Sequence, residues 1–151
     1  MAIIRPAREN DIDRILELYR ELAITTSPSE LSQNSSPDDY RRAFAEIQAR
    51  PGYELLVIEE HGEVVGTVVF LIAPNLSHRA SPWALVENLV IDHRHRRRGL
   101  GKQLMDYATA RAKEAGCYRI VLTSDKRRRQ AHRFYRSLGF VSSSHGFRLY
   151  F

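Results

Sequence analysis

The chain of 151 residues has the length of one ordinary domain, and its 43% hydrophobic and 27% charged residues exclude wholesale disorder. The formal charge of +5 and the pI of about 9.7 favour an anionic partner, a class that includes nucleic acid, phosphate-bearing cofactors and acidic membranes. One cysteine, Cys117, excludes an intramolecular disulfide and a cysteine-based metal site.

The N-terminal residues carry a charge as early as Arg5 and form no signal-type apolar run. No apolar stretch elsewhere approaches the length of a membrane span. We therefore expect one domain over residues 1–151, in the cytoplasm and without membrane contact.

Hydrophobic periodicity divides the chain into strands, which are rich in β-branched residues, and helices, whose apolar residues recur every three or four positions. Asn10 and Asp11 precede the first helical stripe and are candidate N-caps, while Gly116 is a candidate C-cap. In chain order, the expected elements are a strand at 2–6, a helix at 9–23, a loop at 24–37, a helix at 37–49, strands at 53–60, 63–73 and 83–91, a helix at 99–115, a strand at 118–124, a helix at 129–139 and strands at 140–144 and 147–151.

This order of elements predicts a mixed α/β sheet. The strands at 53–60 and 63–73 are joined by His61 and Gly62 and should form an antiparallel hairpin. The strand at 83–91, the helix after it and the next strand form a crossover unit, which requires a parallel pair. We therefore expect a mostly antiparallel central sheet with one parallel pair and flanking helices.

A basic run with two glycines joins the strand at 83–91 to the next helix. A helix N-terminus exposes unpaired N–H groups, Gly99 and Gly101 allow close approach, and arginines bind phosphate oxygens, so this turn is a candidate phosphate site. It lacks the Gly-Lys-Ser/Thr ending of an ATP loop, and Leu104 stands where a dinucleotide fingerprint needs its third glycine. The alternative is a solvated or nucleic-acid-binding patch, although residues 93–103 contain none of the aromatics typical of nucleic-acid binding.

Two motifs resemble the GNAT family of N-acetyltransferases. The first, R-x-x-G-x-G, stands at Arg96, Gly99 and Gly101, after the strand that ends in VENLVID. The second, A-x-x-F-Y-x-x-L-G-F, stands at Ala131, Phe134, Tyr135, Leu138, Gly139 and Phe140. The resemblance extends over essentially the whole chain and implies that the parallel pair is splayed apart.

The resemblance also implies that acetyl-CoA is the co-substrate, with its diphosphate in the loop and its pantetheine arm along the preceding strand. The implied contacts are with the strand residues Leu89, Val90 and Ile91, the loop residues Arg96, Arg97, Arg98, Gly99, Leu100, Gly101 and Lys102, and Tyr135 near the thioester. Many relatives have Asn three residues before the alanine of the second motif, where this chain has Arg128. Arg128 could bind the 3′-phosphate of CoA or simply begin a surface helix.

Acetyl transfer to an amine requires a base, because an alkylammonium group has a pKa of about 10.4, and an acid that protonates the departing thiolate. Tyr135 is the candidate acid by resemblance, and the alternative is a packed aromatic. Glu87 is the candidate base, since a carboxylate in an apolar strand should have a partner or face a cleft. The alternative for Glu87 is a salt-bridged structural residue, and strand alternation places Asn88 on the opposite face. The resemblance puts the oxyanion donor at a backbone N–H near Val90.

The acceptor is expected to be a small primary amine that attacks directly within a ternary complex. Its candidate walls are the loop at 24–36, Tyr40, Trp83 and the turn at 142–146. The rival hypothesis is a non-catalytic module that binds CoA or nucleic acid. The oligomeric state stays open, with a homodimer among the alternatives.

The remaining reactive side chains carry weaker signals. Cys117 has no motif around it and is expected to be a small buried residue rather than an acyl carrier. His132 is expected to be a surface or supporting group. The six histidines show no metal-ligand spacing, so no metal site is expected.

Overall fold

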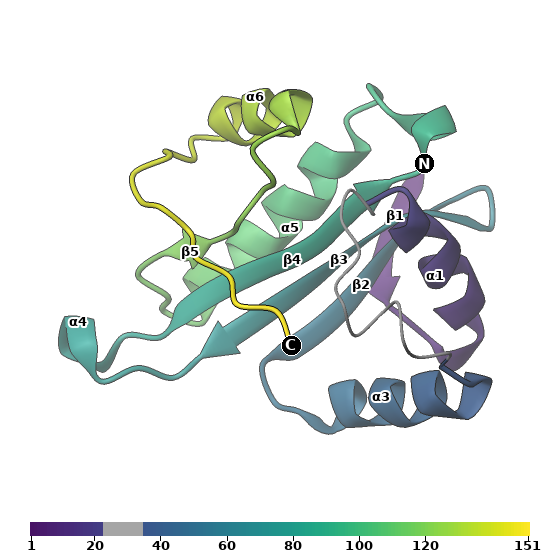
Figure 1. Cartoon of the computed structure of the whole chain (residues 1–151), viewed down its shortest axis with the longest axis horizontal. Helices are drawn as coiled ribbons and strands as arrows, with labels where there is room; N and C mark the ends of the chain where they lie inside the picture. Colours follow the sequence, from purple (N-terminus) through teal and green to yellow (C-terminus); the bar gives the residue numbers. More distant parts are fainter. Residues whose placement is uncertain (23–34) are drawn as a thin grey trace.

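The computed structural model describes residues 1–22 and 35–151. Most of the expected loop at 24–37, together with residue 23 of the first expected helix, lies outside this part. The described strands form one five-stranded sheet in the order β1-β2-β3-β4-β5 (Figure 1). The strands are β1 (Ala2–Pro6), β2 (Tyr53–Glu60), β3 (Glu63–Ala73), β4 (Trp83–Ile91) and β5 (Ile120–Val121). Neighbouring strands are antiparallel except for β4 and β5, which confirms the expected mixed sheet.

Helices cover both faces of the sheet (Figure 1). The helices are α1 (Ile12–Arg20), α3 (Pro37–Ala49), α4 (Ser77–Ala80), α5 (Leu100–Glu114) and α6 (Arg129–Ser137), with 3₁₀ turns η1 (Glu9–Asp11) and η2 (His93–His95). α5 and α6 pack on one face, around buried Leu104 and Phe70, and α1 and α3 pack on the other, around Leu18 and Phe44. Within the described residues, no helix is long and apolar enough to cross a bilayer.

β4 contains a bulge at Asn88, which has a φ of 52°. Glu87 pairs with Val69 and Val90 pairs with Thr67, so two residues of β4 lie opposite one residue of β3. The bulge shifts the alternation of the strand: Leu89 packs with the α5 side of the core, whereas Val90 packs with the α1 side. Even-numbered side chains of β4 therefore face the α5 side of the sheet before Asn88, whereas odd-numbered side chains face it afterwards.

β4 and β5 pair only at Ala84 with Ile120 and at Leu85 with Val121. Beyond these pairs the two strands separate, which confirms the expected splayed parallel pair. The expected strand at 118–124 is correspondingly reduced to two residues. The edge of β4 that faces β5 has no strand partner after Leu85 in the described part of the chain.

The expected strands at 140–144 and 147–151 are not present. Phe147, Leu149 and Phe151 alternate as in a half-buried strand, yet their side chains are exposed. Alternation predicts a strand only where an edge offers ladder hydrogen bonds, and β5 is too short to offer one. The expected N-cap role of Asp11 toward α1 is also wrong, because its carboxylate binds the Arg8 backbone N–H and the Arg5 guanidinium, both at 2.7 Å.

Buried Asp92 connects α1 to the end of β4. Its carboxylate accepts hydrogen bonds from Arg14 Nη2 at 2.5 Å and from Arg94 Nη2 at 2.8 Å. Arg14 also donates from Nε to the Val64 carbonyl at 2.9 Å. The bonds from Arg94 hold the pKa of Asp92 well below its usual range, with a further contribution from Arg14, although burial opposes them. This network fixes the position at which β4 turns toward α5.

We predict that Asp92→Asn lowers the free energy of unfolding by about 3 kcal/mol at pH 7, because the arginines lose their buried counter-charge. Because the pKa of Asp92 is lower in the folded protein than in the unfolded chain, its ionised carboxylate stabilises the fold above the unfolded pKa of about 3.9. This stabilisation is lost as the pH falls below that value. The difference in free energy of unfolding between wild type and Asp92→Asn should therefore narrow below about pH 4. Urea unfolding measured against pH checks both parts.

The matched control is Asp106→Asn, which removes the exposed partner of Lys102 on α5. An exposed pair of this kind contributes less than about 1 kcal/mol. Equal losses of stability in the two variants, or a difference that does not depend on pH, would contradict the role given to Asp92.

Candidate active site

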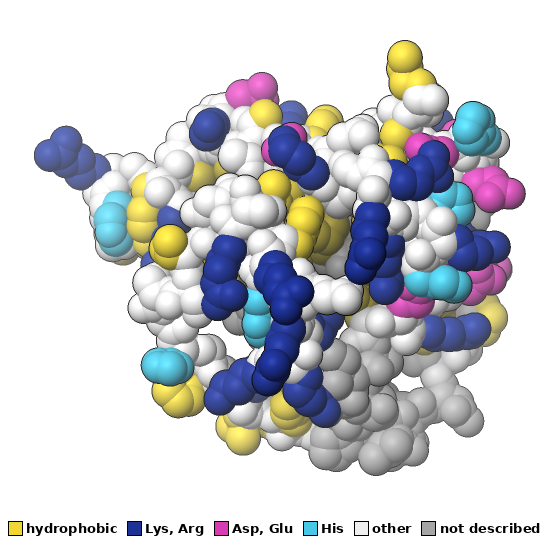
Figure 2. All heavy atoms as spheres, turned by 90° about the horizontal axis from the view of Figure 1, so that it is seen from above, with side chains coloured by type: hydrophobic (Ala, Val, Ile, Leu, Met, Phe, Trp, Pro, Cys, Tyr) yellow, Lys and Arg dark blue, Asp and Glu magenta, His cyan; other side chains and the backbone are white. Residues whose placement is uncertain are grey.

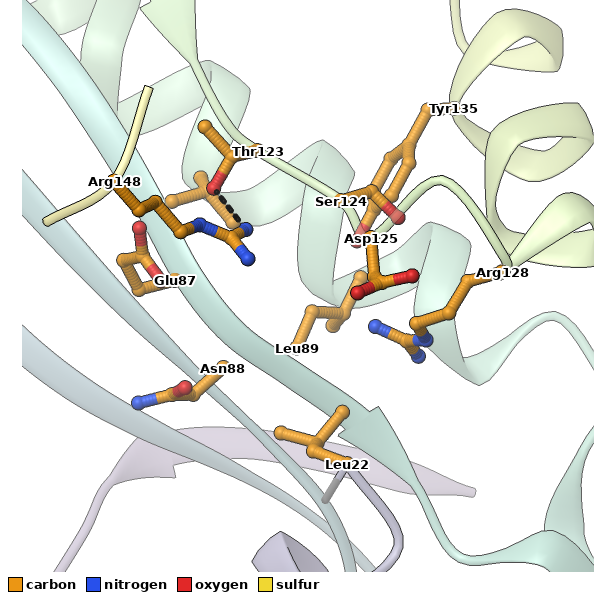
Figure 3. A pocket seen from close by; sticks show the side chains of 11 residues that line it. Leu22, Glu87, Asn88, Leu89, Thr123, Ser124, Asp125, Arg128, Tyr135 and Arg148 are labelled. Atoms are coloured by element: carbon orange, nitrogen blue, oxygen red, sulfur yellow. Dashed lines mark hydrogen bonds between the residues drawn. The ribbon is translucent and has the colours of Figure 1, made fainter. Parts of the chain in front are cut away.

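A pocket lies in the gap where β4 and β5 separate (Figure 3). One wall comes from β4 around its bulge, the other from the segment after β5, and α6 and the C-terminal segment close the two ends. The lining residues are Leu22, Val86, Glu87, Asn88, Leu89, Thr123, Ser124, Asp125, Arg128, Tyr135 and Arg148. Two expected catalytic residues, Glu87 and Tyr135, thus meet at one pocket, although they are 48 positions apart in the sequence.

Tyr135 extends from α6 into this pocket (Figure 3). Its ring contacts Phe140 edge to face, with ring centroids 6.0 Å apart. Burial raises the pKa of the Tyr135 phenol, Arg128 lowers it, and the Glu87 carboxylate raises it further. The phenol is therefore protonated at neutral pH and can donate a hydrogen bond or a proton.

Glu87 is half-buried on the β4 wall, and its carboxylate has no hydrogen bond or ion pair with any residue in the described ranges. Burial raises the pKa of its carboxyl group, and Arg148 lowers it. This carboxylate faces the pocket, as the cleft alternative requires, rather than forming a structural salt bridge. A raised pKa makes it a stronger base than an exposed glutamate.

Asn88 lines the same pocket as Glu87, so its expected position on the opposite face is wrong. Its positive φ is the reason, because the bulge interrupts the two-residue alternation on which that expectation rested.

The turn between β4 and α5 has backbone N–H groups that lack acceptors in the described chain. Gly99 caps α5 with a φ of 80°, and Arg97 before it has a φ of 60°. Throughout residues 1–22 and 35–151, no group accepts a hydrogen bond from the N–H groups of residues 96–102. A side chain added at Gly99 would meet no described atom within 4 Å, so the space beside it is open. This arrangement suits a diphosphate.

Gly101 also allows two helices to pack closely. A Cβ atom at this position would lie 3.3 Å from Cζ of Phe134, which is closer than a comfortable contact. The first turn of α5 and the middle of α6 therefore approach closely because Gly101 has no side chain. In this way one glycine of the first motif positions the helix that carries Tyr135.

Most cationic side chains of the turn bind acidic residues of the protein. Arg96 donates to Glu21 at 2.6 Å and to the Ile91 carbonyl at 2.9 Å, Arg98 lies 3.1 Å from Glu60, and Lys102 lies 2.6 Å from Asp106. Arg97 has no ion pair within the described chain. Lys and Arg side chains nevertheless gather on this face of the molecule (Figure 2). The groups available to a diphosphate at this turn are therefore mainly backbone N–H groups, and the Lys and Arg side chains around them make the local electrostatic potential positive.

The strand residues expected to contact the cofactor begin four residues beyond Leu85, where the last β4–β5 pair lies. Val90 is buried, and Leu89 and Ile91 are half-buried. The edge of β4 that faces β5 here is free of strand pairing, although Arg96 already binds the Ile91 carbonyl. Because buried backbone groups must be paired, this edge suits an extended ligand such as the pantetheine arm.

Arg128 immediately precedes α6 and projects into the pocket at the end away from Arg148 (Figure 3). It has no ion pair with the residues that the structure describes. Its pocket position favours ligand contact over the surface-helix alternative.

Several lining residues were missed from the sequence, among them Leu22, Thr123, Asp125 and Arg148. Arg148 stands in a stretch expected to be a strand, and no motif distinguishes it. Conversely, Tyr40 and Trp83, two expected acceptor walls, do not line this pocket. Tyr40 lines a separate hollow beside α1.

The other reactive side chains take no part in the pocket. Cys117 is half-buried rather than fully buried and packs against the α5 side of the core, and this partial burial raises the pKa of its thiol. His132 Nε2 lies 2.8 Å from the Asp125 carbonyl and so supports the pocket wall. Glu21, Asp92 and His93 lie close enough to hold a metal ion, but arginines already bind both carboxylates.

Comparisons with known proteins agree with this geometry. The model of the "Acetyltransferase (GNAT) family" matches residues 12–140. A glucosamine 6-phosphate N-acetyltransferase from Trypanosoma brucei brucei is 26% identical over 97% of this chain and 93% of its own length. An aminoalkylphosphonate N-acetyltransferase from Salmonella typhimurium is 29% identical over 93% of this chain and 85% of its own.

A third relative is longer than this chain. It is a probable glucosamine 6-phosphate N-acetyltransferase from Drosophila melanogaster, 26% identical over 92% of this chain, and the match spans 60% of its length. Solved structures show that the similarity to known proteins includes the fold. A crystal structure named a transcriptional regulator, from Bacillus halodurans C-125, is 34% identical, with a TM-score of 0.86 over 100% of both chains.

The family model covers most of the chain, and the two sequence motifs on which the resemblance rested lie at the splayed strands and at the helix that carries Tyr135. The co-substrate of this family is acetyl-CoA, and the activity is acyl-CoA-dependent N-acyl transfer. The chain belongs to the acetyltransferase (GNAT) family.

Proposed function

We propose that the protein moves the acetyl group of acetyl-CoA to a small primary amine by direct attack within a ternary complex. The observation that carries this proposal is the pairing of an unpartnered carboxylate, Glu87, with a protonated phenol, Tyr135, in the gap between β4 and β5. Two relatives are named for acceptors that combine an amine with a phosphate or phosphonate, which supports a small acceptor.

In this proposal the turn at residues 96–102 binds the diphosphate through its N–H groups, and Arg97 adds charge. The pantetheine arm lies along Leu89 to Ile91, where β4 has no strand partner. Arg128 contacts a phosphate of CoA. The thioester then lies near Tyr135.

Chemistry begins when Glu87 accepts a proton from the ammonium group of the acceptor, directly or through water. The free amine attacks the thioester carbonyl, and a backbone N–H near Val90 stabilises the oxyanion. Collapse of the tetrahedral intermediate breaks the C–S bond, and Tyr135 protonates the departing thiolate. The proton that remains on the attacking nitrogen passes, directly or through water, to the Tyr135 phenolate, which leaves a neutral amide and restores the phenol. Cys117 takes no part, so no covalent acyl-enzyme forms.

We predict that Gly99→Asp raises the Kd for acetyl-CoA at least about 10-fold, because a carboxylate would occupy the space meant for the diphosphate. The matched control is Gly99→Asn, since Asn has the same shape, tolerates a positive φ and carries no charge. Isothermal titration of both variants checks the prediction. Equal affinities in the two variants would overturn the assignment of the turn.

We predict amine-dependent release of CoA thiol when the protein is mixed with acetyl-CoA and a panel of small primary amines. Tyr135→Phe should lower kcat about 100-fold and leave acetyl-CoA binding intact, because it removes only the proton donor. A thiol-reactive dye measures the rates.

The outcomes separate the rival hypotheses. Binding of acetyl-CoA without thiol release from any amine would indicate a non-catalytic CoA-binding module. Salt-sensitive retention of DNA, without stabilisation by acetyl-CoA, would indicate a nucleic-acid-binding protein. Full turnover by Tyr135→Phe would refute the role of Tyr135 as the acid but would leave the proposed transferase activity intact.

We predict that Glu87→Gln lowers the rate about 100-fold at pH 7 and much less at high pH, where the amine deprotonates without a base. Because the pKa of Glu87 is raised, wild-type activity should rise as the pH passes through that value and Glu87 ionises. The pH profiles of kcat/KM for both proteins check this. A loss that is equal at every pH would make Glu87 a structural residue.

A further inference from the structure

Arg148 places a guanidinium group in the pocket wall without an acidic partner. Its Nη2 donates to Thr123 Oγ1 at 3.2 Å, and its Nη1 lies 3.5 Å from the Tyr150 hydroxyl. Both partners are neutral. No carboxylate of the described chain lies within 4.0 Å of it, whereas Arg96, Arg98 and Arg127 each have such a partner.

The two carboxylates of the pocket do not neutralise Arg148. Asp125 is bound by Arg127 through two hydrogen bonds of 2.9 and 3.0 Å. Glu87 is close enough for Arg148 to lower its pKa, but the two groups form no ion pair. Arg148 lowers the pKa of Asp125 as well, yet neither carboxylate forms an ion pair with it, so N–H donors of its guanidinium group remain available to an anionic group of a ligand.

The two guanidinium groups of the pocket lie at opposite ends (Figure 3). Arg128 lies at the start of α6, near the side on which CoA is placed. Arg148 lies beside Glu87, the group that faces the acceptor amine. An anion bound by Arg148 therefore belongs to the acceptor rather than to the cofactor.

We propose that Arg148 determines acceptor specificity by binding an anionic oxygen group, so that the acceptors are small amines that also carry a phosphate, phosphonate or carboxylate. The proposal rests on the proposed function and extends it, because it assigns to the acceptor an anionic group in addition to its amine. Arg148 offers a planar fork of donors that matches such groups in bidentate fashion. Glu87 and Arg148 side by side form a complementary pair for a zwitterionic molecule.

The test compares matched amines with and without the anionic group. The amines are 2-aminoethylphosphonate, β-alanine and propylamine, together with glucosamine 6-phosphate and glucosamine. Thiol release gives kcat/KM for each amine with wild type, Arg148→Gln and Arg148→Lys at one fixed pH. The control variant is Arg79→Gln, which removes an exposed positive charge on α4, far from the pocket (Figure 1).

We predict that wild type prefers the anionic member of at least one matched set. Arg148→Gln should reduce that preference about 10- to 100-fold, mainly through KM, because one charge-assisted contact is lost. Arg148→Lys should restore part of it, and Arg79→Gln should behave as wild type. The phosphonate and carboxylate arms show which anion is preferred.

Two results would overturn the proposal while leaving the transferase intact. One is a wild-type enzyme that turns over the neutral amines as well as the anionic ones. The other is an equal loss of kcat on both members of a set with a shifted pH profile, which would make Arg148 only a counter-ion of Glu87. Absence of thiol release from every amine would instead refute the proposed function.

Discussion

The separation of β4 from β5 after only two residue pairs is the constraint on which the site depends. A backbone edge inside a protein needs hydrogen-bond partners, so a strand that loses its neighbour leaves room for a ligand that can replace it. The bulge at Asn88 lies at this point and alters which side chains face the gap. The pocket and the open strand edge thus follow from the separation of β4 from β5, and the bulge determines which β4 side chains face the gap.

Charge is distributed so that binding and structure use different groups. Asp92 and Glu21 bind arginines around the turn and thereby fix the positions of β4, α1 and the turn itself. In the proposed complex the diphosphate is left to backbone N–H groups, whose positions the fold determines and which need no side-chain ordering. Three of the described guanidinium groups that have no acidic partner, Arg97, Arg128 and Arg148, lie where ligands are proposed to bind.

The order of elements, the parallel pair and the candidate turn were predictable because each depends on local periodicity or on a short motif. The missed features depend on tertiary context. The two C-terminal strands were predicted from alternation alone, but alternation does not say whether a partner edge exists. Asn88 was placed on the wrong face because a bulge has no reliable single-residue signal. Arg148 could not be found, since its place beside Glu87 arises only when the C-terminal segment folds over β4 (Figure 1).

A crystal structure of the protein with acetyl-CoA is the most direct test of the central claim. We expect the diphosphate against the N–H groups of residues 96–102, the pantetheine arm between β4 and β5, and the thioester sulfur beside Tyr135. A cofactor bound on another surface, or a gap between the strands filled by the protein's own side chains, would contradict it.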